Sequence, residues 1–88
     1  MKTVARLVLI EWLDSHSGRG WQTAEMLRQA AEPLYCQSVG WLLSDTKDCK
    51  VLVPHIGGER DGDMMMQGCG DLVIPARAIV KMTPLVKG

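Results

Sequence analysis

Residues 70–85 read "GDLVIPARAIVKMTPL", in which an apolar stretch stops at a proline, turns through "PARAI" and resumes as a second apolar stretch. Pro75 has no N–H to donate to a strand ladder, so a strand is expected to end near it. The residues that follow can wind one 3₁₀-type turn before the chain re-enters a sheet. The C-terminal region therefore predicts two strands joined by a single tight turn.

Three more segments upstream have strand character. They read "TVARLVLIEWL" at 3–13, "LYCQSVGWLLSD" at 34–45 and "CKVLVPHI" at 49–56, each rich in β-branched and large apolar residues. Between the first two, Thr23 can cap a helix over about residues 23–32, which Pro33 ends. Five short strands with one inserted helix predict a mainly β fold, a small five-stranded SH3-like or Sm-like barrel, with residues 1–88 as a single domain.

The alternation along 34–45 predicts which side chains are buried. Tyr35, Val39, Trp41 and Leu43 share one parity, so we expect that face to meet the core. The expected core is Trp41, Leu43, Val51, Val53, Ile74 and Ile79. Gly40 lies within the same strand, where a glycine usually marks a bulge, a sharp bend or a close backbone approach.

The charge balance bears on the class of partner. Ten basic and ten acidic side chains give no net charge, which removes the general attraction to phosphates that supplies most non-specific nucleic-acid affinity. An Sm-like nucleic-acid-binding barrel is therefore the alternative rather than the favoured reading. A nucleic-acid-binding role would require the basic residues to gather on one face. The residues concerned are Lys2, Arg6, Arg19, Arg28, Arg60, Arg77, Lys81 and Lys87. Trp12, Trp21 and Trp41 could stack on bases, but packing in the core is the favoured role.

The chemistry-bearing residues are too widely spaced to predict a site. His16, Cys36, Cys49, His55 and Cys69 include no pair within four residues, unlike ordinary zinc ligands. Cys49 and His55 would lie roughly 20 Å apart along one strand, and Cys69 could meet a histidine only through the fold. We therefore expect no catalytic, metal or cofactor-binding residue, and not an enzyme.

The odd number of cysteines and the lack of a secretory leader predict reduced thiols in the cytoplasm. Apolar runs fall short of the roughly 20 residues that span a bilayer, so no membrane association is expected.

The segment "GGERDGDMMMQGCG" at 57–70 is long for a structureless loop in a small domain. Its acidic residues lack the order of a calcium-binding loop, and its glycines favour mobility. Met64, Met65 and Met66 either plug one end of the barrel or contact a partner, because adaptable methionines are frequent on binding surfaces. The sequence leaves both roles open.

The motifs "SVGWLL", "VLVPHI" and the "IP…I" turn resemble those of a group of small proteins encoded in tailed-phage and prophage genomes. The resemblance implies a small SH3-like barrel of phage-associated origin, placed in the cytosol of the host cell, and it implies no functional residue. With the composition, it leads us to expect a non-enzymatic protein-binding or assembly module. Its expected partners are copies of itself or another phage or host protein.

Overall fold

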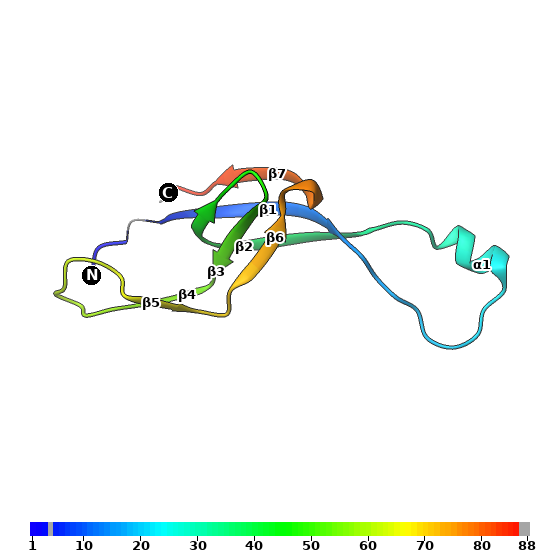
Figure 1. Ribbon diagram of the computed structural model, residues 1–88, viewed down its shortest axis with the longest axis horizontal. Coiled ribbons are helices and arrows are strands. Elements are labelled where there is room, and N and C mark those ends of the chain that lie inside the picture. Colours follow the sequence, from blue (N-terminus) through cyan, green and yellow to red (C-terminus); the bar gives the residue numbers. More distant parts are fainter. Residues whose placement is uncertain (4, 87–88) are drawn as a thin grey trace.

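A computed structural model describes residues 1–3 and 5–86 of the chain. The protein is mainly β and elongated, with extents of 60 × 27 × 24 Å (Figure 1). Its elements, in chain order, are β1 (Arg6–Asp14), α1 (Ala24–Gln29), β2 (Leu34–Asp45), β3 (Cys49–Val53), β4 (His55–Gly57), β5 (Gln67–Cys69), β6 (Leu72–Pro75), the 3₁₀ turn η1 (Ala76–Ala78) and β7 (Ile79–Pro84). The mainly β class and the five strands of the main sheet confirm the coarse prediction.

The main sheet is antiparallel with strand order β6-β3-β2-β1-β7, and β4 and β5 form a separate two-stranded sheet. The expected closed barrel is wrong in one respect, because the sheet stays open. Within the described residues β6 and β7 share no ladder and lie on opposite edges, with three strands between them. The sheet is strongly bent instead, so that β3 and β6 cross in front of β1 and β2 (Figure 1).

The turn predicted from Pro75 is confirmed. β6 ends at Pro75, three residues form the 3₁₀ turn η1, and β7 begins at Ile79. This turn carries the chain from the edge at β6 to the other edge, where β7 pairs antiparallel with β1. The single strand predicted over residues 49–56 is wrong, because Pro54 separates β3 from β4 and a proline has no N–H to continue the ladder.

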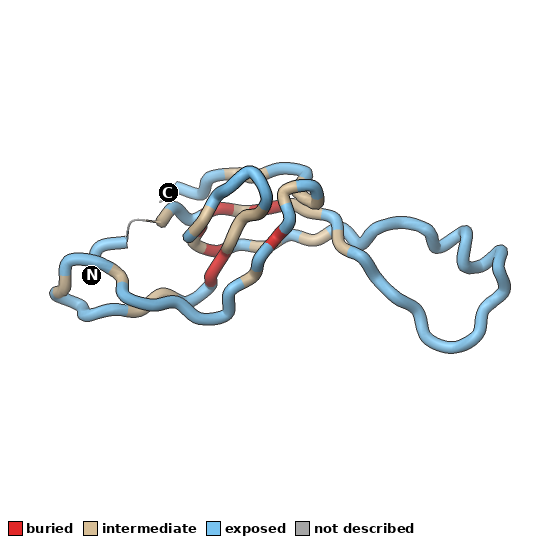
Figure 2. The backbone as a smooth tube through the Cα atoms, viewed as in Figure 1, coloured by how far each residue is buried: buried red, intermediate tan, exposed pale blue. Residues whose placement is uncertain are grey.

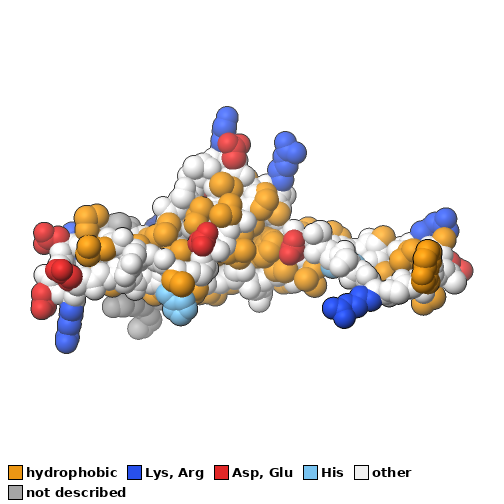
Figure 3. All heavy atoms as spheres, turned by 60° about the horizontal axis from the view of Figure 1, so that its bottom comes forward, with side chains coloured by type: hydrophobic (Ala, Val, Ile, Leu, Met, Phe, Trp, Pro, Cys, Tyr) orange, Lys and Arg blue, Asp and Glu red, His pale blue; other side chains and the backbone are white. Residues whose placement is uncertain are grey.

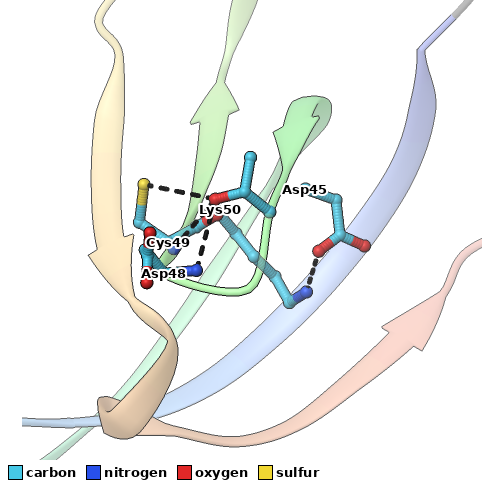
Figure 4. Close-up of polar contacts among 5 residues, drawn as sticks. Asp45, Asp48, Cys49 and Lys50 are labelled. Carbon is cyan, nitrogen blue, oxygen red and sulfur yellow. Dashed lines mark hydrogen bonds and ion pairs between the residues drawn. The ribbon is translucent and has the colours of Figure 1, made fainter.

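Thr46 organises the turn between β2 and β3 (Figure 4). Its hydroxyl oxygen accepts from the backbone N–H groups of Asp48 (3.3 Å) and Cys49 (3.2 Å), and the hydroxyl donates to the Cys49 carbonyl (3.1 Å). Lys50 and Asp45, which are cross-strand partners at the mouth of the turn, form an ion pair. Three hydrogen bonds and one ion pair therefore hold the hairpin turn between β2 and β3.

The core is small and lies inside the bend of the sheet (Figure 2). One buried cluster contains two residues of β1 and one each of β2, β3 and β6, namely Val8, Ile10, Leu42, Leu52 and Ile74. Trp12, Leu72, Ala78, Ile79 and Met82 pack around it and are partly buried.

The predicted core was wrong for its two residues of β2, Trp41 and Leu43, because β2 buries the opposite parity. Gly40 and Leu42 are buried, whereas Leu43 is exposed. Of the six residues expected, Val53 and Ile74 are buried and Trp41, Val51 and Ile79 are half-buried. The cause is a close strand approach at Gly40, where an added Cβ would lie 2.9 Å from the Val53 carbonyl oxygen.

Candidate interaction surface

The strands β1 and β2 extend beyond the rest of the sheet as a two-stranded ribbon. Arg6–Asp14 pairs along its whole length with Leu34–Leu42, but the pairing of β1 with β7 stops at Trp12. The connection between the ribbon strands, residues 15–33, is called the arm. It projects from one end of the molecule and carries α1 (Figure 1).

Local hydrogen bonds shape the arm. At its base, the Nε2–H of His16 donates to the carbonyl oxygen of Glu32. Thr23 is the N-cap of α1, as predicted, and its hydroxyl accepts from the Met26 backbone N–H at 3.2 Å. The helix is shorter than the expected 23–32, since it ends at Gln29 and the chain leaves helical geometry at Ala30.

None of the residues of α1 is buried. Met26 and Leu27 are more than half exposed, and Trp21, just before the helix, is 104% exposed, so its indole touches nothing. Isolated helices shorter than about 12 residues are marginal in water, and most helices are stabilised by packing an apolar face. The six-residue α1 buries no residue against the described part of the chain.

The three tryptophans lie in three different environments. Trp12 packs against the core, and its Nε1–H donates to the Ser38 hydroxyl at 3.0 Å. Trp41 is half-buried, and Trp21 is on the exposed arm. Packing in the core, expected for all three, is therefore wrong for Trp21. Since Trp41 pairs with Leu7 and Trp12 with Cys36 across the ribbon, Trp12 and Trp41 belong to opposite faces and form no shared platform.

The face of the ribbon opposite the core is also apolar. Cross-strand partners lie on the same face of a sheet, and the partners on this face are Leu7–Trp41, Leu9–Val39, Glu11–Gln37 and Leu13–Tyr35. We call the six apolar members the outer band: Leu7, Leu9, Leu13, Tyr35, Val39 and Trp41. Four of them are classed as exposed, and Val39 is the most exposed at 56%.

The sequence carried a signal for the outer band that parity reasoning did not use. In β1 both parities are apolar, with Val8 and Ile10 on the core side and Leu7 and Leu9 on the other. A strand that is apolar on both faces is typical of a sheet covered on both sides. In the described residues the core covers one side, and on the other side only the end near Trp41 is covered, where its cross-strand partner Val53 is buried next to Gly68 of β5. The rest of the outer band is largely exposed.

A polar cluster interrupts the outer band at Glu11. The Tyr35 hydroxyl donates to the Glu11 carboxylate, and Gln37 Nε2 donates to the Tyr35 oxygen at 3.2 Å. The hydrogen bond to Glu11 raises the pKa of Tyr35 above its ordinary value of 10.0, since ionisation would place two negative oxygens side by side. The cluster fixes the Tyr35 ring against the ribbon.

The methionine segment forms part of a hairpin beside the main sheet (Figure 1). Gly57 in β4 pairs with Gln67 in β5, and the N–H of Met65 donates to the Lys2 carbonyl at 3.1 Å. Met65 is half-buried, whereas Met64 and Met66 are exposed. Two of the three methionines are thus positioned to contact a partner, and the mobility of residues 57–70 stays a prediction.

The residues considered for metal or thiol chemistry remain dispersed. Among the described residues, no group of three or more His, Cys, Asp or Glu side chains could hold a metal ion. The fold does bring His55 opposite Cys69 in the small sheet, a pairing that the sequence could not predict. Both residues are exposed, and the structure gives no hydrogen bond between them. Activated thiols need a base and a group that orients it, and this pair lacks that arrangement in the described part of the chain.

A cleft of about 600 Å³ lies where the arm meets η1. Asp14, His16 and Glu32 line it on the arm side, and Arg77 and Ala78 line it on the η1 side. It is open and carries charges of both signs. It marks the boundary between the arm and the body of the protein rather than an enclosed ligand pocket.

Basic side chains are scattered along the molecule. In Figure 3 the lysines and arginines project singly from both ends and from the middle, with hydrophobic side chains between them. Of the eight basic residues considered for nucleic acid, Lys87 lies outside the described residues. The face shown therefore has hydrophobic patches and no continuous basic stripe.

Comparison of the chain with family models, with characterised proteins and with solved structures finds no match. Across residues 1–3 and 5–86, no helix is long and apolar enough to cross a membrane.

Proposed function

We propose that this protein is a non-enzymatic assembly module that acts by binding protein and that associates with copies of itself. Its scaffold is an SH3-like sheet, an assignment supported by the strand order with β7 returning beside β1 after the 3₁₀ turn η1. The resemblance of its motifs to small phage and prophage proteins supports a phage-associated origin and a place in the cytosol of a host cell.

The observation that carries the proposal is the amount of surface the chain exposes. Its accessible surface is 7079 Å², whereas a compact monomer of 9.7 kDa exposes about 5,100 Å². The radius of gyration, 17.3 Å, likewise exceeds the roughly 12 Å expected of a compact domain of this length. A folded chain with about 2,000 Å² of surplus surface, much of it apolar, is completed by contacts with other molecules.

Nucleic acid is the less favoured partner. The chain carries no net charge, and the arm and the outer band expose large apolar side chains, including Trp21, Leu27 and Val39. A binding surface for phosphates would instead present lysines and arginines together.

The test is light scattering coupled to size-exclusion chromatography over a range of protein concentrations. We expect a particle of at least twice the 9.7 kDa chain mass. A mass of one chain at every concentration would overturn the self-association. In parallel, fluorescence anisotropy with labelled single-stranded DNA should show no binding near physiological salt. Tight binding that weakens steeply with salt would instead favour the nucleic-acid alternative.

A further inference from the structure

Two apolar surfaces of this chain lack a cover, and they are of complementary kinds. One is the outer band, a sheet face presented by β1 and β2. The other is the arm, whose short helix exposes Met26 and Leu27, with Trp21 just ahead of it. A helix with an apolar stripe and a sheet with an apolar face are the two layers that ordinarily bury each other in a domain.

The two surfaces cannot meet within one chain. The outer band lies along the same two strands that continue into the arm, so the arm points away from the band along the long axis of the molecule (Figure 1). The ribbon pairs between Trp12–Asp14 and Leu34–Cys36 hold the base of the arm at the far end of the band. In this arrangement a cover for each surface comes from another molecule.

We propose that the arm of one copy docks on the outer band of a second copy, with Trp21 and Leu27 against Val39 and its neighbours. This inference rests on the proposed self-association and states how it occurs. A standard interface buries about 800 Å² on each partner. A chain that both gives an arm and receives one would lose about 1,600 Å², which accounts for most of its surplus of about 2,000 Å².

The charges of the arm are compatible with this contact. The positive charges of Arg19 and Arg28 are balanced by the negative charges of Glu25 and Glu32. The arm therefore brings no net charge from these residues to a second chain. Like charges facing each other would disfavour binding. The indole of Trp21 is the strongest candidate for an anchor, because tryptophan is enriched among the residues that dominate binding energy.

The first experiment measures the dissociation constant of the oligomer after removal of the arm's apolar side chains. In the double variant Trp21→Ser/Leu27→Ser we expect the dissociation constant of the oligomer to rise at least about 30-fold, as for the loss of an anchor residue. Both side chains are exposed in the single chain, so the variant should melt at the temperature of the wild type measured at a concentration where the wild type is dissociated. The matched control is Val80→Ser, whose parent side chain is 60% exposed on β7, outside the residues of the arm and the outer band. Its complex should remain intact.

The second experiment locates the contact. In a background with the three native cysteines replaced by alanine, chains carrying Trp21→Cys are mixed with chains carrying Val39→Cys and oxidised. We expect a disulfide-linked dimer in that mixture and little in a mixture of Trp21→Cys with Val80→Cys.

The outcomes separate this inference from the proposed function. If the wild-type chain is a monomer, both fail. If it self-associates but the arm variant associates equally well, the docking fails and the assembly function stands. Equal cross-linking of Trp21→Cys chains with one another would mean that the arms meet tip to tip, which also overturns the docking on the outer band.

Discussion

Adding a single methyl group at Gly40 should destabilise the fold, because two strands approach most closely there. Gly40 has no positive φ, so its backbone suits any residue and the requirement is for space alone. A Cβ would lie 2.9 Å from the Val53 carbonyl oxygen, 3.2 Å from the Val53 carbonyl carbon and 3.4 Å from the Leu52 Cβ. The nearest atoms belong to the backbone of the adjacent strand, so the strands themselves must move apart.

The size of the effect follows from two opposing terms. Overpacking a tight site costs about 1–3 kcal/mol, and contacts with backbone place Gly40→Ala in the upper half of that range. Restricting the unfolded chain by replacing glycine with alanine returns about 0.4–1 kcal/mol. We therefore expect a net loss of about 1–2.5 kcal/mol, which lowers the melting temperature by about 5–15 °C in a domain of this length.

Thermal unfolding followed by circular dichroism at fixed protein concentration measures this loss. Gly57→Ala is the matched control, because a Cβ there meets the side chain of Gln67 at an ordinary 3.6 Å. It should melt at or slightly above the wild-type temperature. If Gly40→Ala and Gly57→Ala melt together, the close approach of β2 and β3 does not constrain the fold and the reasoning is refuted.

Three further outcomes are expected. Ile74→Ala should lower the free energy of unfolding in urea by about 2–5 kcal/mol, because the Ile74 side chain is fully buried. Leu43→Ala, at an exposed position, should lower it by less than about 1 kcal/mol. Equal losses would mean that Leu43 is buried, as the sequence predicted. Absorbance titration of Tyr35, the single tyrosine, should give a pKa above 10.0 that falls in Glu11→Gln. The stability from this hydrogen bond is present below the pKa of Tyr35 in the unfolded chain and is lost as pH rises through the raised pKa in the folded chain. A measured pKa of Tyr35 at or below the ordinary value would show that the bond does not form. Cys69 is the exposed thiol and Cys36 and Cys49 are half-buried, so Cys69 should react first with a thiol reagent in the native protein, and simultaneous reaction of all three would contradict the fold.

Several strand ends could be predicted from local signals. Pro75 and the three residues after it specify where β6 ends and β7 begins, since a proline cannot continue the ladder. The polar turn at 45–49 specifies the hairpin of β2 and β3. These signals are local, and the structure confirms each of them.

The buried face of β2 could not be chosen from its own pattern. Leu42 on one parity and Trp41, Val39 and Leu43 on the other are all apolar, so alternation gives no decision. The decision comes from Gly40, whose missing side chain lets Val53 approach. The identity of the strand that approaches is a property of the three-dimensional fold.

The exposure of Trp21 could not be predicted from the amino-acid composition either. A tryptophan is buried in most proteins on average, but the ribbon of β1 and β2 carries this one beyond the reach of the core. The pairing length of two strands, nine residues each, determines this outcome. Pattern reasoning locates strands well and does not give the length over which they remain paired.

The place of β1 inside the sheet has a consequence for synthesis. β1 is the first of these strands to leave the ribosome, yet one of its two neighbours is β7, the last. Until Ile79–Pro84 has emerged, the apolar β1 presents an unpaired edge, which is a template for association with other nascent chains. Pairing across such a sequence separation is also slow. The yield of native protein should therefore depend on how well β1 is protected while the rest of the chain is made.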